Sequence, residues 1–306
     1  MLDKIKLPVG PFRDGSGAGR GSSGRSNHEN MEAMKTRLKL AGGMTAAVLA
    51  LGAQAAPALA QTDYYNTDTG RPVRIEDAYP VERYAFELQL APLRLERASG
   101  GVYSWEVAPE IAYGILPRTQ LEIGFPIAFV DAGGEGKTTA LAGIEIAALH
   151  NLNVETRTLP ALAVAADVLL PVGGLGPDRA YTSLKGIATR TLSWARFHAN
   201  AQYTLGSDAE EGEDVGEASR WMAGVAVDRT FPLRSLLVTA DVFAEQPLHD
   251  DEDLSWTAET GLRYQTSPQF NVDLGVGRRF AGDDQGWFFT FGAAHAFAVR
   301  SLMPFR

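Results

Sequence analysis

The chain has 306 residues, with 28 Lys and Arg, 37 Asp and Glu, and no Cys. The absence of Cys excludes disulfides, thiolate metal sites and cysteine nucleophiles. The net charge of -9 argues against a nucleic-acid partner, whose phosphates require a basic surface. An apolar content of 45% is ordinary for a soluble globular protein, but the placement of the apolar residues indicates another class.

The first sixty residues predict a leader. Residues 34–60 combine a basic start with a short apolar stretch that ends in Ala-Leu-Ala at Ala60. This pattern is typical of a secretory signal peptide, so we expect export with cleavage after Ala60; an uncleaved anchor is the alternative. Residues 1–33 precede the signal, which indicates a mis-assigned start or a disordered leader, with translation beginning at Met31 or Met34.

The rest of the chain alternates with period two, and no stretch has helical periodicity. A polar stretch at 61–83 predicts an extended periplasmic segment, 84–298 predicts the folded part, and 299–306 a C-terminal extension. Alternation of apolar and polar residues is the signature of β-strands. The predicted strands are 84–95, 103–115, 119–130, 139–149, 160–171, 182–191, 196–205, 219–229, 235–246, 255–265, 269–280 and 286–298.

Twelve strands of about ten residues each match the length that crosses a bilayer at a tilt. We therefore predict an all-β fold, a transmembrane antiparallel up-and-down β-barrel of about twelve strands. The polar face of these strands combines small residues with charges, which we expect to face the lumen. The candidate lumen-lining residues are Glu87, Glu106, Glu110, Glu122, Glu145, Asp167, His198, Arg220, Asp241, Glu259, Arg263 and Asp273.

Aromatic residues recur at both ends of the apolar face, as in the aromatic girdles of outer-membrane barrels. A soluble exported β-sandwich, the alternative, has no reason to sort its aromatic residues in this way. The predicted outer girdle comprises Trp105, Phe129, Tyr203, Trp221, Trp256 and Trp287. The predicted inner girdle comprises Tyr84, Tyr113, Phe197, Tyr264, Phe270 and Phe297.

The connections on the two sides of the predicted barrel differ in charge. Those on one side hold five Arg and one acid, Glu155, whereas the longer ones on the other side hold sixteen acids against Arg97, Lys137 and Arg179. Short turns in the periplasm and longer loops outside are the usual layout. The prolines at 92, 109, 126 and 160 interrupt this pattern, and each should lie at a bulge or at a lost ladder bond.

Several short motifs carry a resemblance. They read RTQLEIGFP at 118–126, GLRY at 261–264, DLGVG at 273–277, GD at 282–283 and WF at 287–288. With these motifs the chain resembles the phenol-degradation meta-pathway family of Gram-negative outer-membrane proteins. The resemblance implies a β-barrel transporter for small hydrophobic or aromatic compounds. It also implies that barrel-assembly machinery reads a final aromatic residue; Phe297 takes that place although the chain continues to Arg306.

The charged residues leave two interpretations of the lumen open. Inward carboxylates are consistent with a cation-favouring, porin-like pore or with a structural network of carboxylates and Arg in a nearly filled barrel. The dense acidic runs at 208–214 and 250–253 lack the spacing of a calcium loop and read as solvated loops, although they offer a way of bridging to lipopolysaccharide through divalent cations.

Enzymatic motifs are missing from the sequence. There is no G-x-S-x-G and no H-E-x-x-H. His198 is the one candidate base, with Asp241 or Glu259 as a possible partner, but no activated Ser accompanies it. We therefore expect no enzyme, no cofactor and no metal; a lipid-modifying hydrolase is the less favoured alternative.

Together these patterns predict an outer-membrane β-barrel channel or transporter for the passage of small molecules. Its expected partners are outer-membrane lipid and lipopolysaccharide, a small-molecule solute and the barrel-assembly machinery, and no nucleic acid. A sealed structural barrel is the main alternative.

Overall fold

The computed structural model describes residues 66–90, 93–97, 103–131, 137–209, 218–249, 252–283, 285–299 and 302. The predicted leader, the signal peptide with its cut after Ala60, and all but residues 299 and 302 of the C-terminal extension lie outside these residues. The chain divides into the units Met1–Pro57 and Ala58–Arg306, and the fold below belongs to the second. In the described part of the chain, no helix has the length and apolarity needed to cross a membrane.

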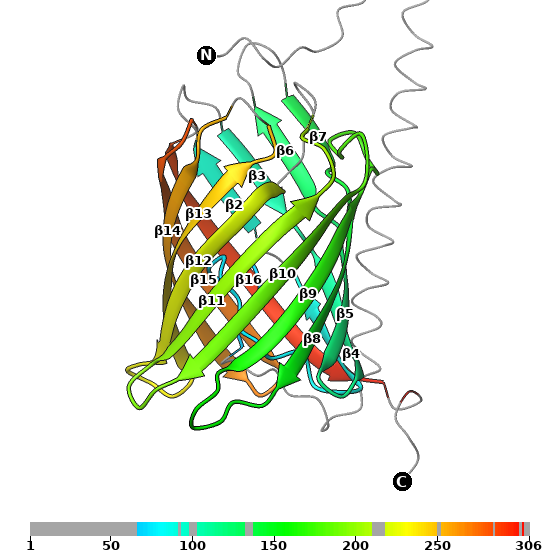
Figure 1. Ribbon diagram of the computed structural model, residues 1–306. Helices are drawn as coiled ribbons and strands as arrows, with labels where there is room; N and C mark the ends of the chain where they lie inside the picture. The colour runs from blue at the N-terminus through cyan, green and yellow to red at the C-terminus, as the bar shows by residue number, and fades with distance from the viewer. Residues whose placement is uncertain are drawn as a thin grey trace, which may run out of the picture. The chain divides into compact units, whose positions relative to one another are not determined.

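Sixteen strands among the described residues form one antiparallel sheet (Figure 1). Their bounds are β1 Ala85–Gln89, β2 Leu93–Arg97, β3 Tyr103–Val107, β4 Glu110–Leu116, β5 Thr119–Gly124, β6 Ile127–Asp131, β7 Lys137–Leu141, β8 Ile144–Asn153, β9 Ala161–Leu170, β10 Tyr181–Thr191, β11 Arg196–Leu205, β12 Ser219–Thr230, β13 Leu236–Pro247, β14 Ser255–Ser267, β15 Phe270–Ala281 and β16 Gly286–Ala298.

The sheet closes on itself because β16 pairs with both β1 and β2. At one end of β16, Ala298 lies opposite Ala85, and at the other Trp287 lies opposite Arg97. The pairs β1–β2, β3–β4, β5–β6 and β7–β8 are each the two halves of one interrupted crossing, whereas β9 to β16 cross without a break. The chain thus crosses twelve times, and the predicted fold class of a twelve-stranded antiparallel barrel is confirmed.

Prolines and a glycine account for the interruptions. Pro109 separates β3 from β4 and Pro126 separates β5 from β6; neither has an N–H to give to the ladder. Gly143, with a φ of +117°, separates β7 from β8. Two backbone hydrogen bonds connect neighbouring crossings at these interruptions. The N–H groups of Phe125 and Ala142 donate to the carbonyl oxygens of Pro109 and Pro126, at 2.9 and 2.8 Å. The two prolines thus lie where regular ladder bonds are missing; Pro92 lies outside the described residues.

The outer face of the barrel is apolar and exposed. Leu274 and Phe289, on neighbouring strands, are each 56% exposed, and aromatic pairs stack across the outer ends of strands, such as Trp105 and Phe129 with ring centroids 5.4 Å apart. In water such a continuous apolar surface is unfavourable, whereas lipid covers it without cost. The chain is a transmembrane β-barrel of the outer-membrane type.

The two ends of the barrel differ as the sequence predicts. Connections at 117–118, 154–160, 192–195, 231–235 and 268–269 lie at the end that holds Ala85 and Ala298. The longer connections lie at the opposite end, beside β6 and β7 (Figure 1). We assign the end with the short turns to the periplasm because short turns face it in barrels of this kind.

Candidate functional site in the barrel lumen

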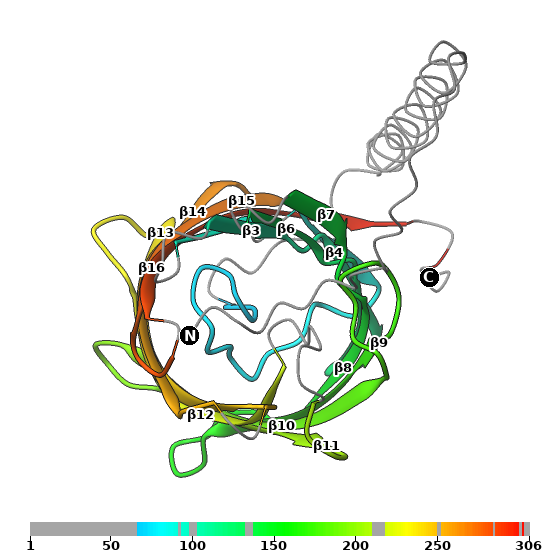
Figure 2. The same cartoon turned by 90° about the horizontal axis from the view of Figure 1, so that it is seen from above.

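The chain preceding β1 lies inside the barrel. We call residues 66–83 the luminal segment; Figure 2 shows it, in blue and cyan, within the ring of strands. The sequence predicted an extended periplasmic stretch here. The structure corrects its location, because the segment follows the inner wall from β15 and β16 through β14, β13, β11 and β10 to β5 and β4.

Inward polar side chains bind the backbone of the luminal segment. An irregular segment away from bulk water needs partners for its N–H groups, and five strands of the wall each supply one acceptor. The N–H groups of Arg74, Ile75, Glu76, Ala78 and Val81 donate in turn to Glu259, Asp241, Asn200, Thr189 and Gln120, at 2.7, 2.9, 3.0, 2.9 and 2.5 Å. The wall is therefore built to hold this segment.

A buried ionic cluster fixes the start of the segment. Arg71, on the segment, donates from Nε and Nη2 to Asp273 Oδ2 at 3.1 and 2.9 Å, and Arg263 of β14 donates to the other oxygen of the same carboxylate. All three side chains are nearly or fully buried. Arg263 also reaches Asp68 and the carbonyl oxygen of Arg71. Buried charges of this kind are tolerated only when they are paired in this way.

Inward glycines make room for the segment. A Cβ on Gly261 would lie 2.6 Å from the Cβ of Pro72, and one on Gly224 would lie 2.8 Å from the Cδ1 of Ile75. On Gly275 a Cβ would meet the carbonyl oxygen of Pro72 at 2.5 Å. Side chains at these positions would displace the segment, so its shape and that of the wall are complementary.

His198 belongs to the same anchoring system. Its Nδ1 lies 3.0 Å from Thr189 Oγ1 and its Nε2 2.9 Å from Asp228 Oδ2, which also binds Arg196. The suggested partners Asp241 and Glu259 are thus corrected to Asp228, because Asp241 and Glu259 bind the segment backbone. The hydroxyl, imidazole and carboxylate form a triad-like series, but Thr189 is fully buried and accepts the N–H of Ala78. This geometry provides an anchor and leaves no approach for a substrate.

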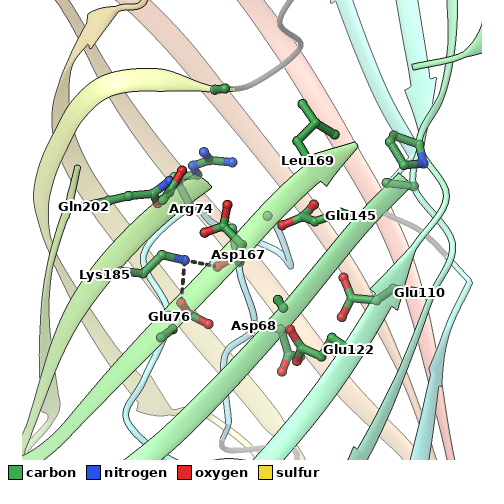
Figure 3. A pocket seen from close by; sticks show the side chains of 18 of the residues that line it. Asp68, Arg74, Glu76, Glu110, Glu122, Glu145, Asp167, Leu169, Lys185 and Gln202 are labelled. Atoms are coloured by element: carbon green, nitrogen blue, oxygen red, sulfur yellow. Dashed lines mark hydrogen bonds and ion pairs between the residues drawn. The ribbon is translucent and has the colours of Figure 1, made fainter. Parts of the chain in front are cut away.

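The segment and the wall together line a cavity of about 180 Å³ (Figure 3). Carboxylates from the wall line it together with Asp68 and Glu76 of the segment, and the basic residues are Arg74, Arg94 and Lys185. Lys185 Nζ donates to Glu76 Oε1 at 2.6 Å and to Thr69 Oγ1 at 3.1 Å. The excess of acidic over basic side chains gives this space a negative potential.

Glu110 and Glu145 lie on either side of a glycine in the cavity wall. Glu110 of β4 lies opposite Gly124, which lies opposite Glu145 of β8. Gly124 carries no side chain, so the two carboxylates border an open position; a Cβ there would lie 3.5 Å from that of Glu145. Gln89 lies opposite Glu110 at the same level, and its buried Nε2 has no hydrogen-bond partner among the described residues.

Apolar residues lie next to these polar groups. Ala147 and Leu149 of β8, Ala165 and Leu169 of β9, and Tyr181 of β10 line the same cavity. Carboxylates alternate with them on the same strands, since Glu145 lies opposite Leu169 and Asp167 opposite Ala147, so the cavity offers carboxylates beside aliphatic or aromatic surface. This combination suits a solute that has an apolar body and a polar or cationic end.

The candidate lumen residues separate into three groups. Those that line the cavity are Glu106, Glu110, Glu122, Glu145, Asp167 and Glu259. Those buried against the luminal segment and its anchors are Glu87, His198, Asp241, Arg263 and Asp273. Arg220 lies instead at the rim of the barrel, where it binds Asp208 and the carbonyl oxygens of Thr204 and Gly206, because the β12–β13 register shifts between Ser219 and Trp221.

Sequence reasoning missed the neutral members of the site. Gln120, Thr189 and Asn200 face inward and bind the luminal segment, and Gln89 lines the cavity. The cationic Lys185 of β10, which also lines the cavity, was missed as well. These residues fall on the inward-facing positions of the alternating strands, and that position was the signal that could have identified them. In the described part of the chain no group of three or more His, Cys, Asp or Glu side chains is placed to hold a metal ion. Residues 210–214 and 250–251 of the two acidic runs lie outside that part.

Comparison with known proteins gives similarity of structure alone. No family model matches the chain, and no curated protein matches it in sequence. Among solved structures it is similar to an outer-membrane channel from Pseudomonas putida F1, with 15% identity over 76% of this chain and 100% of that one and a TM-score of 0.49. It is also similar to the KdgM porin, with 11% identity over 69% of this chain and 99% of that one and a TM-score of 0.45. The outer-membrane phospholipase A of Escherichia coli is similar with 9% identity over 71% of this chain and 94% of that one and a TM-score of 0.38.

Proposed function

We propose that the protein is an outer-membrane channel that passes small solutes through the acidic cavity beside its luminal segment. The observation that carries the proposal is the cavity itself, which is lined jointly by the wall and the segment. Charged side chains within a membrane protein mark a polar path or a paired structural network. Here both occur: Arg71, Arg263 and Asp273 form a paired cluster, and the cavity carries more carboxylates than bases.

The lining favours small amphipathic solutes. The family resemblance implies hydrophobic or aromatic compounds, and the apolar lining residues from Ala147 to Tyr181 offer such a compound an apolar contact. Glu110 and Glu145 border the same cavity and would orient a polar or cationic end. Repulsion by the carboxylates disfavours anions.

Liposome swelling tests the proposal. Liposomes that contain the folded protein are given uncharged aromatic and aliphatic alcohols, aromatic amines, or aromatic carboxylates of similar size. We expect aromatic amines to enter fastest and carboxylates slowest, and Glu110→Gln with Glu145→Gln to remove the difference. Asp131→Asn, on the outer face, is the control that should preserve it. Entry of none of these solutes would contradict the proposal.

A sealed structural barrel is the second candidate. The continuous anchoring of the luminal segment favours it, because the segment binds acceptors on five strands from β14 to β5 and fills the glycine-lined wall. This candidate predicts no swelling with any solute, both in the parent protein and in the variants.

A further inference from the structure

The outer face carries one row of polar and aromatic residues near the end with the long connections. Each member lies directly opposite the next in the strand register, across β15, β16, β2, β3, β6 and β7. The row consists of Arg278, Trp287, Arg97, Tyr103, Asp131 and Lys137.

Strand alternation places this row on the lipid-facing surface. Arg97 shares the parity of Leu95, which is exposed, and Arg278 shares that of Leu274. Trp287 and Tyr103 are each 54% exposed. The neighbouring inward positions have different partners, since Arg279 binds Glu96 across the inner face. The row is therefore separate from the cavity and its ion pairs.

The guanidiniums of Arg97 and Arg278 each lie over an aromatic ring. The guanidinium of Arg278 lies 5.3 Å from the ring centroid of Trp287, and that of Arg97 lies 5.4 Å from that of Tyr103. Neither has an ion pair among the residues that the structure describes. Cation–π contacts orient a guanidinium and leave its N–H donors available.

The row lies beyond an apolar row on the same outer face. The next outward row towards the middle of the barrel consists of Val276, Phe289, Leu95, Trp105, Phe129 and Thr139. Apart from Thr139 these residues are apolar, and Trp105 and Phe129 stack as a girdle would at the edge of the hydrocarbon. The basic row thus lies one step further towards the long connections than this apolar row, on the side of the outer-leaflet phosphates.

Positive charge at this end of the barrel is concentrated in the row. The long connections and the strand ends beside them hold sixteen acids and three bases, and two of those bases, Arg97 and Lys137, belong to this row. Acidic loops around the barrel repel phosphates, so a stretch with exposed guanidinium groups is where an anionic lipid can approach. Arg recognises phosphate through paired N–H donors in a planar fork.

We infer that this row binds the phosphate groups of an outer-leaflet glycolipid, as found in lipopolysaccharide, with Arg97 and Arg278 as the main donors. Trp287 and Tyr103 orient the guanidiniums and contact the upper acyl and sugar region. Lys137, paired with Asp131 at 2.7 Å, extends the row by a weaker contact. The inference goes beyond the proposed function and does not depend on conduction.

The test measures lipid binding to the folded full-length barrel in nanodiscs. The probes are a bisphosphorylated lipid A, the same lipid without its phosphates, and inorganic phosphate as a competitor. The variant carries Arg97→Gln and Arg278→Gln; Arg229→Gln, on the outer face at the periplasmic end of β12, is the matched control. Heat-modifiable gel mobility establishes that each protein is folded.

We expect the double variant to lose about tenfold or more in affinity for the phosphorylated lipid, because charge-assisted contacts are removed. The control should bind like the parent, and Arg97→Lys with Arg278→Lys should retain part of the affinity. Equal affinity in the double variant, or equal binding of the lipid without phosphates, would overturn the inference. A third result would also overturn the inference: the parent protein binds inorganic phosphate at millimolar concentration but shows no preference for the phosphorylated lipid. The row would then be a site for free phosphate ions and not for a lipid.

Discussion

Arg71 and Asp273 are 202 positions apart in the chain, yet Arg71 Nη2 lies 2.9 Å from Asp273 Oδ2. This pair joins the luminal segment to β15, and Arg263 completes the cluster from β14. All three charges lie away from bulk water, and the cluster fixes the position at which the segment first contacts the wall. Any model of transport through this barrel has to account for a lumen that already contains an anchored segment.

Removing the shared carboxylate should strongly destabilise the protein. Asp273→Asn leaves Arg71 and Arg263 buried with one fewer counter-charge, and breaking a buried ion pair from one side costs about 3–5 kcal/mol. We expect a loss of that order in the free energy of unfolding in detergent, followed by denaturant titration. Asp131→Asn, which removes an exposed pair with Lys137, should cost less than about 1 kcal/mol. Equal losses in the two variants would show that the cluster does not anchor the fold.

Adding a methyl group to the glycine-lined wall should loosen the luminal segment. Gly261→Ala places a Cβ 2.6 Å from that of Pro72, and Pro72 or the wall has to move. We expect faster trypsin cleavage after Arg74 and a larger conductance. Gly186→Ala is the matched control, because the nearest atom to its Cβ is 4.0 Å away. Unchanged cleavage in Gly261→Ala would contradict the observed fit.

Acidity should strengthen the docking of the segment through Asp77. Burial raises the pKa of this carboxyl from 3.8 to about 7, and the Arg196 guanidinium offsets part of the rise. Because the folded state binds the proton more tightly, stability is greatest below about pH 4 and falls as the pH rises to about 7. The Asp77 side chain also accepts hydrogen bonds from the N–H groups of Thr67 and Tyr79. It therefore holds the segment in both its protonated and its ionised form.

The thermal midpoint of the folded barrel, followed by gel mobility between pH 4 and pH 8, measures this contribution. We expect Asp77→Asn to remove the part of the pH dependence that lies between about 4 and 7, since the amide cannot ionise. A pH profile identical to that of the parent would show that another group is responsible.

The strands were predictable because one physical pattern produces them. Period-two alternation gave all twelve crossings and placed Glu110 and Glu145 on the inner face, and the prolines at 109 and 126 indicated lost ladder bonds. The luminal segment was not predictable in this way. It has no periodicity, and its position depends on bonds between distant residues, such as that of Ile75 with Asp241 across 166 positions. Inward glycines at 224, 261 and 275 were the one local signal, because glycine on a strand marks the close approach of another backbone.

Planar-bilayer recording with a salt gradient tests the central claim most directly. If solutes pass beside the luminal segment through the acidic cavity, the protein will show discrete conductance steps with a reversal potential that favours cations. Glu110→Gln with Glu145→Gln will shift that potential towards zero, whereas Asp131→Asn will leave it unchanged. A folded barrel that conducts no ions, or one whose selectivity ignores these two carboxylates, would contradict the account.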